Sequence, residues 1–167
     1  MTRERFSAKD ALVHASVLID GSENTSVRFA TCCRPVPGDA IVGHLGRGEG
    51  LAIHTSSCNV AKKLHYKDSE RFISVEWSDQ MVRAFETGIV VTVNNGKGVL
   101  ARVAGALASA EADINHVDMA EESGEGAMDL RFVIAVRDTQ QLDIVLRNLR
   151  RTASVLRAER IAPSPSS

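Results

Sequence analysis

The feature that most constrains this chain is a strict alternation of apolar and polar residues in its second half. The apolar side chains stand at every second position of residues 128–136: Met128, Leu130, Phe132, Ile134 and Val136. Successive side chains of a strand point to opposite faces, so this pattern predicts a strand with one face buried in a core.

The neighbouring segments predict three more strands and two helices. Residues 85–93 form a nearly continuous β-branched run, as in a central strand, and residues 115–119 are a shorter candidate. Apolar residues recur at helical spacing from Val99 to Ile114 and from Leu142 to Leu156, which predicts two amphipathic helices. With a last edge strand at 157–161, the order β-α-β-β-α-β predicts a ferredoxin-like, four-stranded antiparallel sheet with both helices on one face.

The first half of the chain is smaller and contains several short β-like runs. The predicted strands lie at 16–20, 27–30, 40–45, 50–54 and 72–77. A short helix is expected from Asn59, capped by Ser57 or by Asn59 itself. A module of about 60 residues has a marginal core, which a metal ion or a neighbouring domain often supplements.

Together these segments predict an α+β chain with two modules. The expected divisions are a tail or linker helix at 1–15, a cysteine-containing module at 16–80, a βαββαβ domain at 84–162 and a disordered tail at 163–167.

The composition argues against several classes of protein. Twenty basic residues balance 21 acidic ones, for a net charge of -1, so no global charge attracts nucleic acid or a membrane surface. The N-terminus leads into no apolar stretch of a signal peptide, and no apolar run approaches the about 18 residues of a membrane span. We therefore expect a cytoplasmic protein whose three cysteines, an odd number, are reduced thiols or metal ligands.

Three thiols and one imidazole form the set of greatest chemical interest: Cys32, Cys33, His54 and Cys58. This donor set matches a structural zinc site, and the His54-x-x-x-Cys58 spacing brings two ligands together at a strand–helix junction. Against zinc, adjacent cysteines point in opposite directions if the backbone is extended, and buried thiols can simply pack in an apolar cluster. A redox role is a third alternative, but the chain has no Cys-x-x-Cys motif of the kind that activates a thiol.

Two motifs resemble a known family. Asn95-Gly-Lys-Gly-Val-Leu100, between the first strand and helix of the βαββαβ domain, resembles the Asp/Asn-x-x-Gly-Val/Leu-Leu signature of ACT domains. The runs Arg28-Phe-Ala-Thr-Cys-Cys-Arg-Pro-Val-Pro-Gly-Asp39 and Gly50-Leu-Ala-Ile-His-Thr-Ser-Ser-Cys-Asn59 closely resemble the conserved-cysteine module of long RelA/SpoT-type (p)ppGpp synthetase/hydrolases. In that family the cysteine module immediately precedes a C-terminal ACT domain, and the order here is the same.

The resemblance covers residues 15 to 162 and implies a regulatory function. The family's hydrolase, synthetase and TGS domains have no counterpart here, so we expect a non-catalytic fragment. Its parent would be a stringent-response GTP pyrophosphokinase and guanosine-3',5'-bis(diphosphate) 3'-diphosphatase. The ACT domain is expected to bind a branched-chain amino acid, valine or isoleucine, and to control the remote activities together with the cysteine module. The alternative is a ligand-free module for homodimerisation and for docking on the ribosome.

The expected effector site consists of two segments. Gly96 and Gly98 let the backbone approach a small molecule, and amides at the following helix N-terminus can receive a carboxylate. An apolar lining would suit a branched aliphatic side chain, although the same turn also serves as a plain strand–helix connection. The expected ligand-binding residues are Asn94, Asn95, Gly96, Lys97, Gly98, Val99, Leu100, Asn115, His116, Val117 and Met119.

Four basic residues of the first module are candidates for contact with ribosomal RNA, on the strength of the family resemblance. They are Arg34, Arg47, Lys62 and Lys63. Such charges usually form a solvated surface, so this alternative stays open beside the functional one.

Overall fold

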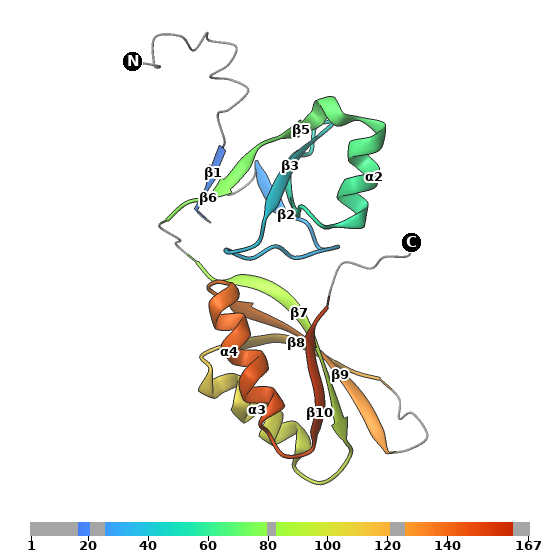
Figure 1. The fold of residues 1–167 in the computed structure, drawn as a ribbon, viewed down its shortest axis with the longest axis vertical. Coiled ribbons are helices and arrows are strands. Elements are labelled where there is room, and N and C mark those ends of the chain that lie inside the picture. The colour runs from blue at the N-terminus through green and yellow to red at the C-terminus, as the bar shows by residue number, and fades with distance from the viewer. Residues whose placement is uncertain (1–16, 21–25, 80–82, 121–125, 162–167) are drawn as a thin grey trace.

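The computed structural model describes residues 17–20, 26–79, 83–120 and 126–161, which form two domains (Figure 1). We call the first, residues 17–79, the cysteine module, and the second, residues 83–161, the βαββαβ domain. The tails expected at 1–15 and 163–167 lie outside the described residues.

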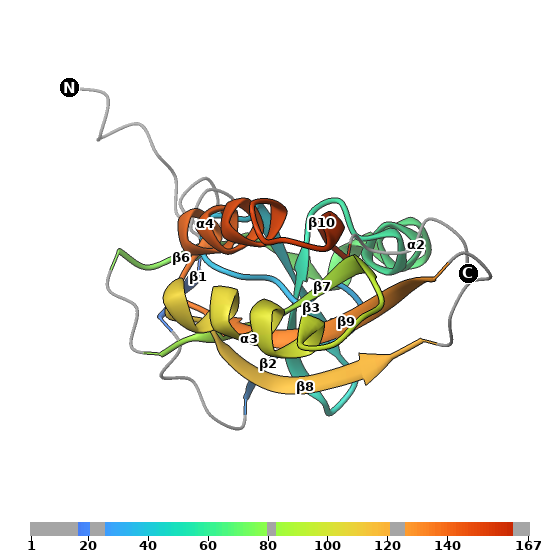
Figure 2. The ribbon, with the colours of Figure 1, turned by 90° about the horizontal axis from the view of Figure 1, so that it is seen from below.

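The βαββαβ domain has the predicted α+β architecture. Its sheet has the strand order β10-β7-β9-β8 with antiparallel pairing throughout, and the two helices pack on one face (Figures 1 and 2). Alternate residues of β9, namely Leu130, Phe132 and Ile134, are fully buried in the core that sheet and helices share. The elements are β7 (Phe85–Asn94), α3 (Val99–Ser109), β8 (Asp113–Met119), β9 (Ala127–Val136), α4 (Thr139–Arg150) and β10 (Val155–Arg160).

The first helix of this domain ends earlier than its apolar spacing predicts. α3 ends at Ser109, and Glu111 adopts a left-handed φ of 61°. The amide of Ala112 then donates to the Leu107 carbonyl at 3.1 Å, which is the bonding that closes many helix C-termini. Ile114, predicted in the helix, therefore lies in β8.

The second helix is also shorter than predicted. α4 ends at Arg150, and Ser154 turns the chain into β10 with a left-handed φ of 74°. Leu156 continues the apolar spacing of the helix by sequence, but it lies in β10, which begins two residues before the predicted edge strand.

The cysteine module contains two small sheets and one helix. The larger sheet has the order β2-β4-β3-β5, with the predicted β3–β4 hairpin at its centre, and β1 pairs in parallel with β6. The elements are β1 (Val17–Ile19), β2 (Val27–Phe29), β3 (Ile41–Gly46), β4 (Gly50–Thr55), α2 (Asn59–Lys67), η2 (Ser69–Arg71), β5 (Phe72–Ile73) and β6 (Val75–Trp77).

Two local predictions for this module are wrong. The strand expected at 72–77 is split at Ser74, because β5 pairs with β3 whereas β6 pairs with β1. The N-cap of α2 is Cys58, which makes no side-chain capping hydrogen bond, rather than Ser57 or Asn59.

The two domains share a packed junction. Val36, from the loop after β2, is fully buried in the core of the βαββαβ domain. The Arg160 guanidinium of β10 donates to both carboxylate oxygens of Asp39 at 2.7 Å, and the Thr139 amide at the start of α4 donates to the Pro37 carbonyl at 2.8 Å. The loop that carries the first two cysteines thus also docks the module onto its neighbour.

Candidate functional site

A tight turn brings the two adjacent cysteines to one side of the backbone. The Arg34 amide donates to the Ala30 carbonyl at 2.9 Å, and Arg34 adopts a left-handed φ of 45°. Cys32 and Cys33 lie inside this turn, with their sulfurs 3.9 Å apart. Adjacent cysteines were expected to point in opposite directions if the backbone is extended, and the turn means that this condition is not met here.

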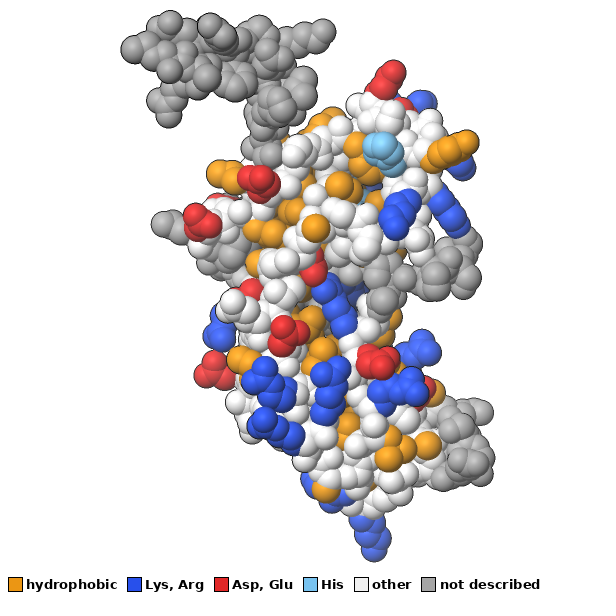
Figure 3. All heavy atoms as spheres, viewed as in Figure 1, with side chains coloured by type: hydrophobic (Ala, Val, Ile, Leu, Met, Phe, Trp, Pro, Cys, Tyr) orange, Lys and Arg blue, Asp and Glu red, His pale blue; other side chains and the backbone are white. Residues whose placement is uncertain are grey.

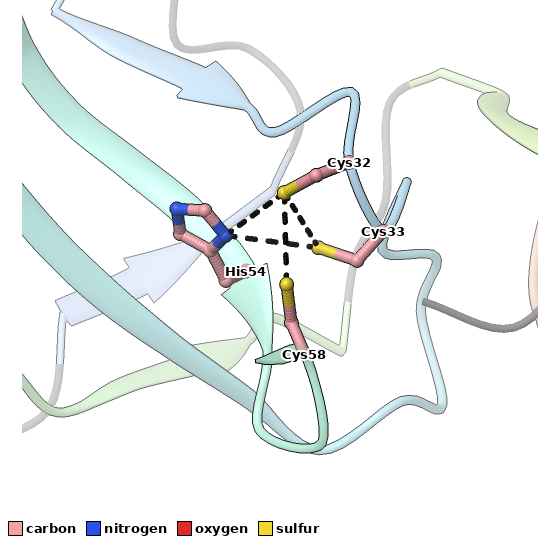
Figure 4. Close-up of side chains that lie close together, drawn as sticks. All are labelled: Cys32, Cys33, His54 and Cys58. Carbon is pink, nitrogen blue, oxygen red and sulfur yellow. Dashed lines mark hydrogen bonds between the residues drawn. The ribbon is translucent and has the colours of Figure 1, made fainter. Parts of the chain in front are cut away.

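The other two members of the set come from the second half of the hairpin and from the helix that follows. His54 lies in β4 and Cys58 lies at the N-terminus of α2, and both are buried. The Cys32 sulfur lies 3.4 Å from His54 Nδ1 and 3.6 Å from the Cys58 sulfur, and the Cys33 sulfur lies 3.8 Å from His54 Nδ1 (Figure 4). The four ligand atoms all lie within 4.8 Å of one another.

Four of the six separations match the edges of a metal-ligand tetrahedron, and the other two, from Cys58 to Cys33 and to His54, lie within 4.8 Å. An ion about 2.3 Å from sulfur and about 2.0 Å from nitrogen places two sulfurs about 3.8 Å apart, and sulfur and nitrogen about 3.5 Å apart. The measured distances are 3.6 and 3.9 Å between sulfurs, and 3.4 and 3.8 Å between sulfur and nitrogen. The cluster could therefore hold a metal ion.

The electrostatics of the cluster disfavour charge unless a cation is present. Burial of its sulfur, followed by the hydrogen bond with Cys58, raises the pKa of the Cys32 thiol to about 12. Burial also raises the pKa of Cys33, although the Thr55 amide, which donates to its sulfur at 3.3 Å, opposes that change. A bound cation is the partner that would favour thiolates in such surroundings.

The surroundings of His54 favour the neutral form of its imidazole. Burial lowers its pKa from 6.5, and the nearby His44 and Arg28 lower it further. A metal-binding imidazole must be unprotonated at the ligating nitrogen, so this shift favours coordination near neutral pH.

The expected effector loop lies between β7 and α3. Gly98 is the N-cap of α3 with a left-handed φ of 75°, and no side chain caps the helix there. Five residues of the loop, Asn94 to Gly98, are exposed, and so is Leu100. Val99 is buried in the domain core, so it packs inside rather than facing a ligand.

The second expected segment lies along the exposed edge strand β8. Asn115 Nδ2 donates to Glu86 Oε1 at 3.1 Å, which places it near the start of β7, whereas the loop follows the end of β7. Val117 and Met119 lie towards the other end of β8 and expose 38% and 53% of their surface. Within one chain the structure therefore does not gather Asn115 and the loop around one point.

The expected RNA-contact residues fall into three places. Lys62 and Lys63 are exposed on α2, where Figure 3 shows basic side chains at the surface. Arg47 is exposed in the β3–β4 turn. Arg34 lies at the domain junction, where its guanidinium donates to Glu86 Oε2 at 2.8 Å.

Sequence reasoning missed the domain junction. Val36, Asp39 and Arg160 belong to no periodic pattern, and the last two are 121 positions apart. The one available signal was Val36, an apolar residue between two prolines, in a segment that forms no regular element.

Comparison with known proteins assigns both domains to families. Residues 17–78 match the family model of the RelA/SpoT RIS domain, and residues 82–160 match that of the ACT domain. The bifunctional (p)ppGpp synthase/hydrolase SpoT of Escherichia coli K12 is 32% identical over 148 residues, which cover 88% of this chain and 21% of that protein. A GTP pyrophosphokinase of Haemophilus influenzae is 26% identical over 145 residues, which cover 87% and 20%.

Among solved structures, the crystal structure of the ACT domain from the GTP pyrophosphokinase of Chlorobium tepidum is similar. It has a TM-score of 0.41 and 20% identity, and it covers 47% of this chain and 99% of that one. The chain spans about a fifth of the length of the curated relatives that it matches.

The fold and the family matches define a two-domain regulatory region of stringent-response enzymes. The chain consists of a RelA/SpoT RIS domain followed by an ACT domain, and it matches the C-terminal region of RelA/SpoT (p)ppGpp synthase/hydrolases. Neither matched family is a catalytic domain. In the part of the chain that the structure describes, no helix is both long and apolar enough to cross a membrane.

Proposed function

We propose that this chain senses an amino acid in the cytoplasm and thereby controls (p)ppGpp synthetase and hydrolase activities elsewhere in a longer protein. The observation that carries the proposal is the N-terminus of α3, where Gly98 is left-handed and no side chain provides a cap. Backbone amides at such an N-terminus bind a carboxylate well, and the macrodipole of the helix favours negative charge there. An α-carboxylate is the natural occupant.

The side chain of the effector is expected to be branched and aliphatic. Leu100 exposes 43% of its surface beside the loop, and Val117 and Met119 offer apolar surface on β8. Asn95 supplies an amide group that can accept a hydrogen bond from an α-amino group. Valine and isoleucine carry this combination of groups.

A second copy of the chain would complete the site. β8 is an edge of the sheet, and all seven of its residues are exposed, including three apolar side chains, Ile114, Val117 and Met119. Exposed apolar edges of this kind favour pairing with another strand. Antiparallel pairing of two β8 strands brings the start of one β8 to the end where the partner's Asn94–Leu100 loop lies, so an effector at this seam would couple the two copies.

The test is calorimetric titration of the chain with valine, isoleucine and leucine. We expect saturable binding of at least one of them, and loss of that binding in Asn95→Ala. Gln140→Ala, at an exposed position on α4, is the matched control and should bind as the unmodified chain does. Absence of binding to a folded sample would remove the sensor proposal.

We propose that the ion of the Cys32–Cys33–His54–Cys58 cluster is zinc. Three sulfurs and one imidazole are a common structural zinc set, and four of the six distances between them fit its tetrahedral geometry. In that position the ion would tie the loop after β2 to β4 and to the start of α2.

Docking on ribosomal RNA is the second candidate function, and helix α2 favours it. Lys62, Lys63 and Lys67 are exposed along this helix, and Tyr66 between them exposes 94% of its surface. Lysines contact phosphates, and an exposed tyrosine ring can stack on an unpaired base. This proposal needs no amino acid effector.

The double substitution Lys62→Glu with Lys63→Glu tests the docking proposal. It should weaken binding to ribosomes by about tenfold or more and reduce the dependence of binding on salt. The control Arg147→Glu with Arg151→Glu makes the same change of charge at two exposed positions at the end of α4 and should have a smaller effect. Equal loss in both variants would show that overall charge, and not α2, determines binding.

A further inference from the structure

A cavity of ≈ 410 Å³ lies where the RIS and ACT domains meet. Its walls come from β2 and the loop after it, from the start of β7, and from Asn115 of β8. Ligand sites in proteins typically have volumes of about 300–1,000 Å³ and often lie between domains. The cavity therefore has a suitable size and place for a small ligand.

The charges that line the cavity are mostly positive. Arg28, Arg34 and Arg83 share its lining with one carboxylate, that of Glu86. Arg34 pairs with Glu86, and Arg28 pairs with Glu49 outside the lining, which leaves Arg83 without a carboxylate partner among the described residues. Glu86 accepts from Arg34 at 2.8 Å and from Asn115 at 3.1 Å, and it thus joins both domains on one side of the cavity.

Arg83 is held in place by aromatic rings rather than by a counter-ion. Its guanidinium carbon lies 4.9 Å from the ring centroid of Phe29 in the RIS domain and 4.9 Å from that of Phe85 in the ACT domain. Among the residues that the structure describes, no carboxylate forms a salt bridge with it. A guanidinium fixed by cation–π contacts and without a carboxylate partner is ready to bind an anion.

Arg34 adds a backbone feature that argues for function. A bulky side chain at a φ of 45° is uncommon, and such conformations persist where the surrounding structure imposes them. The Arg34 carbonyl accepts from Arg160 of the ACT domain at 3.1 Å, so both its backbone and its side chain are held at the junction.

We propose that this cavity is a binding site for a pyrophosphate group that bridges the RIS and ACT domains. Guanidinium groups bind phosphate oxygens through paired hydrogen bonds, and three guanidinium groups in one lining offer more donors than a single carboxylate can accept. The relatives are named for (p)ppGpp, a nucleotide that carries such groups. A ligand that contacts both domains binds their docked arrangement preferentially and therefore stabilises it.

Within one chain this site is separate from the Asn94–Leu100 loop, although Asn115 would border both sites in the proposed dimer. Phe85 and Glu86 begin β7, whereas the Asn94–Leu100 loop follows the end of that ten-residue strand. The two tests remain distinguishable, because Asn95 belongs to the amino acid site alone and Arg83 belongs to the cavity alone.

The experiment is calorimetric titration of the chain with inorganic phosphate, inorganic pyrophosphate and guanosine 5'-diphosphate. We expect one saturable site for pyrophosphate, weaker binding of phosphate, and affinity that falls with ionic strength. Tighter binding of the nucleotide would identify a nucleotide-borne pyrophosphate as the ligand, whereas equal binding would identify the free group. No saturable binding of pyrophosphate, or equal affinity for phosphate, would overturn the proposal.

Two substitutions test whether pyrophosphate binds in this cavity. Arg83→Gln should weaken pyrophosphate binding by about tenfold, as expected for the loss of a charge-assisted contact, whereas Arg151→Gln, beyond the end of α4, should leave it unchanged. Glu86→Gln removes the competing carboxylate and should tighten binding, which keeps the test decisive if Arg83→Gln fails to fold. Unchanged affinity in Arg83→Gln, or weaker binding in Glu86→Gln, would contradict the assignment.

Discussion

The two domains of this chain are stabilised in different ways. The ACT domain has one continuous core, which sheet and helices share and in which Phe132, Leu107 and Leu149 are almost completely buried. The RIS domain has two small clusters instead. Two of the four buried residues of the second cluster are Cys33 and Cys58, which belong to the candidate metal site. The comparison suggests that the ACT domain is stable by itself, whereas the RIS domain depends on its ion and on its neighbour.

Removal of one metal ligand should have the largest effect, and it should affect the RIS domain more than the ACT domain. Cys58→Ala is expected to lower the zinc content from one ion per chain to nearly none, as measured by elemental analysis. Structural zinc contributes about 10–16 kcal/mol in small domains, so the RIS domain should lose its native packing. Trp77, the one tryptophan, stacks on Phe29 at 5.9 Å and meets Phe85 of the ACT domain at 5.2 Å, so its fluorescence reports on the packing of the RIS domain and of the junction.

The matched control for that substitution is Ser57→Ala, at an exposed neighbouring position. It should keep both the zinc and the Trp77 signal. If Cys58→Ala binds no zinc but unfolds as the unmodified chain does, the thiols only pack together in an apolar cluster.

The pH dependence of metal binding should be the next largest effect. Because the pKa values of Cys32 and Cys33 are raised, both thiols are protonated in the metal-free chain near neutral pH, and binding must release their protons. The lowered pKa of His54 means that the imidazole releases none. Affinity should therefore rise with pH by at least about a hundredfold per unit, because Cys32 and Cys33 alone release two protons.

Competition with a chromophoric chelator between pH 6.5 and 8.0 would measure this dependence. A flat profile would indicate that the thiols are already ionised without metal, contrary to the effect of burial on their pKa values.

A smaller effect is expected from the ion pair between the domains. Asp39 and Arg160 expose 12% and 25% of their side chains, so Arg160→Gln should destabilise the docked chain by about 2 kcal/mol in urea unfolding. The exposed pair Arg28–Glu49, with 59% and 67% exposure, provides the control, and Glu49→Gln should cost less than about 1 kcal/mol. Equal losses of unfolding free energy in the two variants would mean that the Asp39–Arg160 pair stabilises the chain no more than an exposed surface pair does.

The sequence predicted the ACT domain better than the candidate metal site. The reason is that periodicity reports which face of a strand or helix is buried, but not which distant segments meet. The alternation of Leu130, Phe132 and Ile134 reports burial on one face of a strand, so the sheet and its helices followed from it. The helix ends were missed because Ile114 and Leu156 happen to continue the helical spacing. The chain leaves each helix through a residue with a left-handed φ, Glu111 or Ser154. Neither residue type predicts such a conformation.

The candidate metal site was predicted by residue type but not by geometry. The residue types alone, three cysteines and one histidine, indicate a possible metal site. The direction of the Cys32 and Cys33 sulfurs depends on the turn that the Arg34 amide closes. Arg34 itself is held by hydrogen bonds with Glu86 and Arg160 of the other domain. Contacts between such distant positions leave no local pattern in the chain.

The most direct test of this account is hydrogen exchange of the whole chain as zinc is removed by a chelator. We predict that amides of β3, β4 and α2 lose most of their protection, while those of β7, β9 and α4 keep theirs, because the ACT core needs no ion. Equal loss of protection in both domains would contradict the account, and so would unchanged protection around the Cys32–Cys58 cluster.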